Sequence, residues 1–157
     1  MNYFSTNDKT LSQTLEYAVY HGFADDGGLF MPDNIPTLPQ AFIKNMGGMT
    51  LQDISYAVAN YALQGDIEAG VLHDIVYDTL NFDIPLTYIS ANNYVLELFH
   101  GPTFSFKDIG ARFLARILAY YQSKRHDGRP LNIVAATSGN TGSAVAHGFA
   151  NIPGVHV

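Results

Sequence analysis

A short apolar run that ends in a glycine-bearing loop constrains the fold of this chain more than any other feature of its sequence. The run, residues 131–136, is nearly continuously apolar, which is typical of a parallel strand buried on both faces. The loop 138–142 follows it and leads into the small-residue segment 142–150, which has helical character. A strand, a loop and a helix in this order indicate a parallel α/β domain, whose ligands bind at the carboxyl ends of the strands.

Neighbouring segments extend this pattern over the second half of the chain. Residues 94–99 are strand-like, apolar residues between 109 and 121 recur at helical spacing, and residues 155–157 resemble the start of another strand. The order β-α-β-α-β predicts an α/β fold with right-handed crossovers. The chain ends where the third strand would begin, so we expect residues 89–157 to be the first, incomplete part of this domain and the chain to be a fragment.

The first half of the chain predicts a different architecture. Apolar residues at helical spacing occur near residues 15–19, 51–62 and 67–80, and no strand is long enough to found a sheet. Residues 25–32 predict a turn that leads into a short extended piece. We therefore expect residues 1–88 to form a mostly helical N-terminal domain.

Composition narrows the possible functions. The chain has 157 residues, is 47% hydrophobic, carries a net charge of −6 and contains no cysteine. The absence of a Lys/Arg run argues against nucleic acid and anionic membranes as partners, and the six histidines lack metal-site pairing. Without a recognisable leader or a long apolar stretch, we expect a cytoplasmic protein with no metal.

Lys107 is the first candidate for chemistry. It follows Phe104, Ser105 and Phe106 and precedes a helical segment. Aromatic neighbours predict that the amine is shielded from water, which lowers the pKa of a lysine and lets the neutral amine form a Schiff base with an aldehyde such as pyridoxal phosphate (PLP). The alternative is an ordinary surface lysine. For Asp108 we expect a carboxylate that only stabilises the helix N-terminus.

The loop 138–142, Ser-Gly-Asn-Thr-Gly, is the second candidate. Backbone N–H groups at a helix N-terminus attract anions, and two glycines allow a ligand to approach closely. The alternative is that its polar side chains merely cap the helix. Because both Lys107 and this loop come directly before helices, we expect them to converge on one crevice.

Three segments in order carry a family resemblance. They are residues 22–32 (GFADDGGLFMP), 97–108 (ELFHGPTFSFKD) and 136–147 (ATSGNTGSAVAH). With them the chain resembles threonine synthase, a fold-type II PLP-dependent enzyme, over its whole length. The Ser-Gly-Asn-Thr-Gly run alone is shared with other fold-type II enzymes, whereas the first two segments separate threonine synthase from them.

The resemblance implies specific roles. Lys107 would carry PLP as a Schiff base, and the loop of Ser138, Gly139, Asn140 and Thr141 would hold the substrate carboxylate. Asn140 would also lie near the 3′-oxygen of the cofactor, although many threonine synthases have Asp at this position.

The implied reaction converts O-phospho-L-homoserine and water to L-threonine and phosphate by β,γ-elimination and replacement. Nothing in the chain matches the family's glycine-rich cradle for the PLP phosphate, so we expect the 157 residues alone to be inactive. The alternatives are another fold-type II lyase, such as a threonine dehydratase, and a non-catalytic protein that binds phosphorylated metabolites. The sequence does not predict the oligomeric state.

Overall fold

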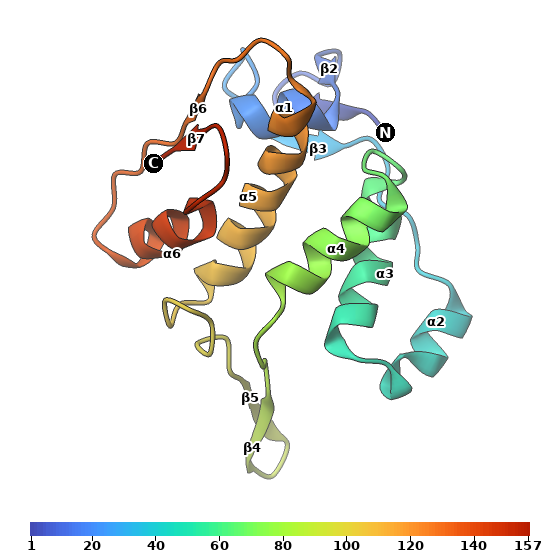
Figure 1. Cartoon of the computed structure of the whole chain (residues 1–157). Coiled ribbons are helices and arrows are strands. Elements are labelled where there is room, and N and C mark those ends of the chain that lie inside the picture. Colours follow the sequence, from blue (N-terminus) through green and yellow to red (C-terminus); the bar gives the residue numbers. More distant parts are fainter. The chain divides into compact units, whose positions relative to one another are not determined.

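The computed structural model describes all 157 residues, and the chain forms two compact units, Met1–Tyr77 and Asp78–Val157 (Figure 1). We call them the N-terminal and the C-terminal unit. The boundary between the units falls after residue 77, before the border expected after residue 88, and the assignment of 1–88 and 89–157 as separate domains stays a prediction. None of the helices combines the length and the apolarity needed to cross a membrane.

The N-terminal unit contains a small antiparallel sheet that was not expected. Its strands are β1 (Tyr3–Ser5), β2 (Ser12–Gln13) and β3 (Phe30–Pro32), in the order β2-β1-β3. The expectation of a sheet-free region was wrong because strands of two or three residues are too short to show a period of two. The extended piece expected before residue 32 is confirmed as β3.

Helices make up most of the remaining N-terminal unit, as expected. They are α1 (Leu15–His21), α2 (Gln40–Asn45), the 3-10 helix η1 (Met46–Gly48), α3 (Leu51–Leu63) and α4 (Ala69–Thr79), which runs into the second unit. Thr50 and Asp53 form a capping box at the start of α3, and Gly22 ends α1 with a φ of 72°. Buried Leu15, Ile67 and Leu72 belong to the core of this unit.

The C-terminal unit begins with a hairpin of β4 (Leu86–Ser90) and β5 (Asn93–Leu96). These strands pair antiparallel, with Thr87 opposite Val95, and Ala91 has a φ of 47° in the turn. The segment 94–99 therefore does not share a parallel sheet with 131–136, as the β-α-β-α-β pattern had suggested. A hairpin needs only a short turn, so the nearest strand in the sequence became its partner.

The remaining elements form the mixed α/β part of the fold that the sequence predicted. They are α5 (Lys107–Lys124), β6 (Leu131–Asn132), α6 (Asn140–Phe149) and β7 (Val155–His156). Strands β6 and β7 pair in parallel, Leu131 with Val155, although β6 includes only the first two residues of the expected strand.

Helices α5 and α6 pack against each other (Figure 1). A Cβ atom at Gly148 of α6 would lie only 3.1 Å from the carbonyl carbon of Ala111 in α5, so the absent side chain permits this approach. The two helices that follow the candidate loops are thereby held close together.

Candidate active site

The two loops singled out in the sequence meet in the C-terminal unit. Lys107 is the first residue of α5 and Thr141 is the second residue of α6. The Lys107 Nζ donates a hydrogen bond to Thr141 Oγ1, across 34 positions of sequence. The expected convergence of the lysine and the glycine-bearing loop is therefore seen as a direct contact between their side chains.

The aromatic neighbours of Lys107 do not shield it as the sequence suggested. Phe104 and Phe106 are 80% and 63% exposed, and Lys107 itself is half-buried. Its Nζ lies 6.0 Å from the centre of the Phe106 ring, at the outer limit of a cation–π contact. Both phenyl rings present their apolar surface to solvent because they flank a turn rather than a core element.

Asp108 has a larger structural role than the helix-end carboxylate that the sequence predicted. Its side chain is completely buried, and its two oxygens accept hydrogen bonds from Thr103, at 2.9 Å from the backbone nitrogen and 2.6 Å from the hydroxyl. A buried carboxylate is costly unless such partners satisfy it. Asp108 thus fastens the loop that precedes Lys107 to the helix that follows it.

Thr137 organises the second loop, a role that sequence reasoning missed. Its Oγ1 accepts hydrogen bonds from the backbone nitrogens of Gly139, at 3.1 Å, and Gly142, at 3.3 Å. The first turn of α6 also contains the N–H groups of Asn140 and Thr141, which have no helical partner, as at any helix start. Two amides are therefore bonded within the loop, and the other two have no partner in the helix.

Both glycines of this loop have a local reason to be glycine. Gly139 has a φ of 142°, which residues with a Cβ rarely adopt. A Cβ at Gly142 would lie 2.4 Å from Thr137 Cγ2, so its absence lets Thr137 reach both amides. Ser138, Gly139, Asn140 and Thr141 are all exposed to solvent.

An open pocket lies beside these groups. It has a volume of about 390 Å³ and is lined by Leu96, Leu98, Phe99, Phe104, Ser105, Phe106 and Asn140. Apolar walls with a few polar groups are typical of small-molecule sites, and the size is adequate for a small ligand. Asn140 lines the pocket and also belongs to the loop 138–142.

A set of connected polar side chains lies just before the loop that precedes Lys107. Glu97 accepts a hydrogen bond from His100 Nε2 at 2.6 Å and another from the Thr87 hydroxyl at 2.8 Å. The contact with His100, followed by the one with Thr87, holds the pKa of the Glu97 carboxyl below its ordinary value of 4.5. His100 therefore has a defined partner just outside the pocket.

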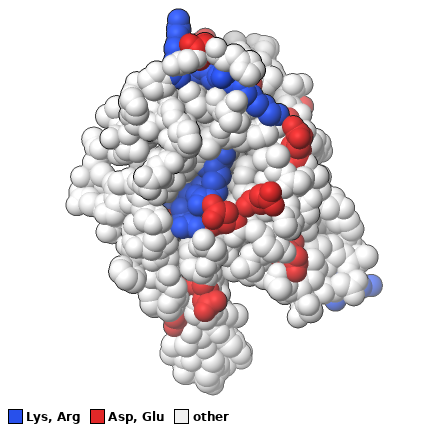
Figure 2. Space-filling view, viewed as in Figure 1, with Lys and Arg blue, Asp and Glu red and all other residues white.

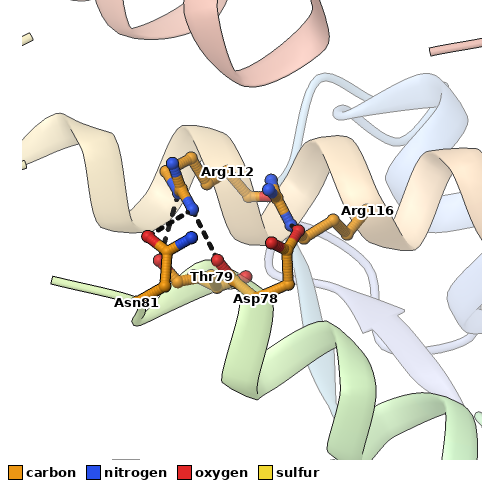
Figure 3. A network of polar contacts seen from close by, with 5 residues as sticks. All are labelled: Asp78, Thr79, Asn81, Arg112 and Arg116. Carbon is orange, nitrogen blue, oxygen red and sulfur yellow. Dashed lines mark hydrogen bonds and ion pairs between the residues drawn. The ribbon is translucent and has the colours of Figure 1, made fainter. Parts of the chain in front are cut away.

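Arg112 anchors α5 to the segment that precedes the hairpin (Figure 3). It is 5% exposed and donates to the carbonyl oxygens of Asp78, at 2.5 Å, and Thr79, at 3.1 Å, and to Asn81 Oδ1, at 2.9 Å. Burial lowers the pKa of the Arg112 guanidinium. Arg116 pairs with Asp78, and Figure 2 shows basic and acidic side chains next to each other over this region.

The fold and the site define a mixed α/β protein in which a lysine and a helix-terminal loop share one candidate ligand site. A family model described as the threonine synthase N terminus matches residues 2–80. The threonine synthase of Haemophilus influenzae is 37% identical over 157 residues, an alignment that covers 100% of this chain and 36% of that relative. The chain belongs to the threonine synthase family.

Solved structures agree with this assignment. The crystal structure of threonine synthase from Escherichia coli has a TM-score of 0.90 and 32% identity, covering 100% of this chain and 36% of that one. The PLP-bound threonine synthase from Brucella melitensis has a TM-score of 0.91 and 34% identity, covering 99% of this chain and 34% of that one. The chain thus spans about a third of the length of the relatives it matches.

Proposed function

We propose that this chain supplies the reactive lysine and the carboxylate-binding loop of a PLP-dependent threonine synthase. The substrate would be O-phospho-L-homoserine, and the products L-threonine and phosphate. The observation that carries the proposal is the hydrogen bond from Lys107 Nζ to Thr141 Oγ1, because it brings a primary amine to the N-terminus of a helix. Family membership supports the same activity.

The residues present fit the cofactor. The pocket of about 390 Å³ has aromatic and aliphatic walls for a ring, and Asn140 offers an amide to a ring oxygen. Lys107 would hold the cofactor through its amine. When bound, the cofactor supplies the electron sink that makes proton loss beside the substrate amine possible.

The chain's own groups would then divide the remaining work. The free N–H groups of Asn140 and Thr141 would bind the substrate carboxylate at the positive end of the α6 dipole. Lys107, once displaced by the substrate amine, would hold and return protons at its Nζ. Thr141 would keep that amine beside the carboxylate loop, because its hydroxyl already accepts from Nζ.

Lysine labelling tests this proposal in the protein expressed from its complete reading frame, hereafter the complete protein. PLP is added, the lysine linkage is fixed with borohydride, and the labelled peptide is mapped. We expect the label on Lys107, loss of phosphate release from phosphohomoserine in Lys107→Ala, and normal turnover in the control Lys44→Ala, which alters an exposed lysine of α2.

Two outcomes would contradict the proposal. Labelling of another lysine, with Lys107 untouched, would remove the assigned amine. Turnover of threonine or serine without any reaction of phosphohomoserine would replace the synthase with a dehydratase-type lyase.

A further inference from the structure

We propose that Asp108 is a positioning residue that fixes the loop 101–106 and thereby sets the place of the Lys107 amine. The inference rests on the proposed function, since it concerns how the reactive lysine is presented. Asp108 does not itself line the pocket, and its carboxylate binds Thr103, which lies outside the lining, so it acts through the backbone on either side of Lys107.

Asp108 binds a single loop residue with both carboxylate oxygens. Oδ2 accepts from the Thr103 backbone nitrogen at 2.9 Å, and Oδ1 accepts from the Thr103 hydroxyl at 2.6 Å. A carboxylate that served only the helix dipole would need no such partner outside the helix. Two hydrogen bonds to one residue fix both the position and the orientation of the loop.

Gly101 packs closely against the same carboxylate. A Cβ at Gly101 would lie 2.6 Å from Asp108 Oδ2, so the buried loop backbone lies directly against the carboxylate. The Phe104 nitrogen donates to the Gly101 oxygen at 3.0 Å, and Phe104 has a φ of 56°. A non-glycine residue in the left-handed region persists only when its surroundings hold it, and Asp108 binds Thr103, the residue directly before Phe104.

Lys107 itself lies between the loop and Asp108 in the chain. Its backbone nitrogen donates to Ser105 Oγ at 3.3 Å, and the Asp108 nitrogen donates to the Ser105 oxygen at 3.0 Å. The backbone of the lysine is therefore held on both sides, which limits the directions in which its side chain can leave the helix.

A second buried charge fixes α5 one turn later. Arg112 lies four residues after Asp108 and is 5% exposed, but its guanidinium binds the segment 78–81 rather than Asp108 (Figure 3). Asp108 therefore has the loop as its own partner. The two side chains tie the start of α5 to two different segments of the C-terminal unit.

The test measures how fast PLP, used as the probe, forms its linkage with Lys107 in the cofactor-free complete protein. Thr103→Val removes the hydroxyl donor and keeps the side-chain shape, and Thr103→Ser restores it. We expect the rate to fall about fivefold to tenfold in Thr103→Val, as for the loss of one hydrogen bond, and to recover in Thr103→Ser. The matched control Thr37→Val alters an exposed threonine of the N-terminal unit and should leave the rate unchanged.

Asp108→Asn tests the acid itself, with the exposed Asp83→Asn as its control. We expect a larger loss of rate in Asp108→Asn, a shifted absorbance maximum of the linkage, and more label on other lysines. If this variant does not fold, the Thr103→Val and Thr103→Ser pair still decides the question.

The outcomes separate the two proposals. Rates and absorbance maxima like those of the parent in Thr103→Val and Asp108→Asn would overturn the role of Asp108 while leaving the proposed function intact. A parent protein that takes no label at Lys107 would overturn both.

Discussion

The two loops of the candidate site are built in opposite ways. The loop before Lys107 is fastened by Asp108, which is completely buried, whereas the loop before α6 is held by the exposed Thr137. The first loop leaves little freedom to its lysine, and the second leaves two amides free for a ligand. Under the proposed function, one site would combine a fixed lysine with an open loop for the substrate.

Adding one methyl group to each loop should give the largest difference in stability between the two loops. Gly101→Ala places a Cβ 2.6 Å from the buried Asp108 Oδ2, which cannot move without losing its partners. We expect the free energy of unfolding to fall by about 2–3 kcal/mol, as for overpacking of a tight site. Gly142→Ala meets Thr137 Cγ2 at 2.4 Å, and rotation of Thr137 would give up its bonds to Gly139 and Gly142, but this loop is exposed and water can replace them, so we expect a loss below about 1 kcal/mol.

Urea denaturation of the complete protein, followed by circular dichroism, checks both values. Equal losses in the two variants would show that the second loop is as rigid as the first. In that case its free amides would belong to a preformed structure with no room to adjust.

A change in the open loop should affect substrate binding rather than folding. Thr141→Val removes a hydroxyl that is exposed and that accepts from Lys107 Nζ. We expect substrate affinity to weaken by about 1–3 kcal/mol, the cost of an unmet hydrogen bond, with little change in the free energy of unfolding. Isothermal titration with phosphohomoserine measures the loss. A variant that binds normally would exclude the hydroxyl from the substrate site.

The smallest effect should be a pH dependence confined to the lysine side of the site. The segment 138–142 has no ionisable side chain, whereas Glu97 precedes the lysine loop and has a lowered pKa because of His100 and then Thr87. A carboxyl whose pKa is lowered by folding stabilises the protein above its ordinary value of 4.5, and this stabilisation is lost as the pH falls through the folded-state pKa.

Thermal unfolding between about pH 6 and pH 3 tests this sign, since the window spans the titration of a carboxyl with a lowered pKa. The fall in melting temperature on acidification should be shallower in Glu97→Gln than in the parent. Glu16→Gln, an exposed glutamate of α1, serves as the control. Parallel curves for the parent and Glu97→Gln would show that the contact with His100 has no energetic consequence.

Long helices and the meeting of the two loops could be predicted from the sequence. Apolar spacing marks α3, α4 and α5 because each spans three or more turns. The parallel pairing of β6 with β7 follows from the strand, loop and helix order. The loops before α5 and α6 could be matched in advance because each carries polar or glycine residues just before a helix.

Other features could not be predicted because their cause lies in tertiary contacts. Strands β1, β2 and β3 have only two or three residues each, too few to show an apolar pattern with a period of two. Strand β5 pairs with β4, the strand directly before it in the sequence. The burial of Asp108 depends on Gly101 and Thr103 folding back over it. The exposure of Phe104 likewise depends on a left-handed backbone conformation that the local sequence does not predict.

The close approach of α6 to α5 at Gly148 has a mechanical consequence for the site. Gly148 stands seven residues after Thr141 on α6, and its neighbour Ala111 stands four residues after Lys107 on α5. A larger residue at Gly148 would push the axes of α5 and α6 apart, about one or two turns from Lys107 and Thr141. We expect such a change to alter the spacing between the Lys107 amine and the Thr141 hydroxyl, from a buried position that lies outside the pocket lining.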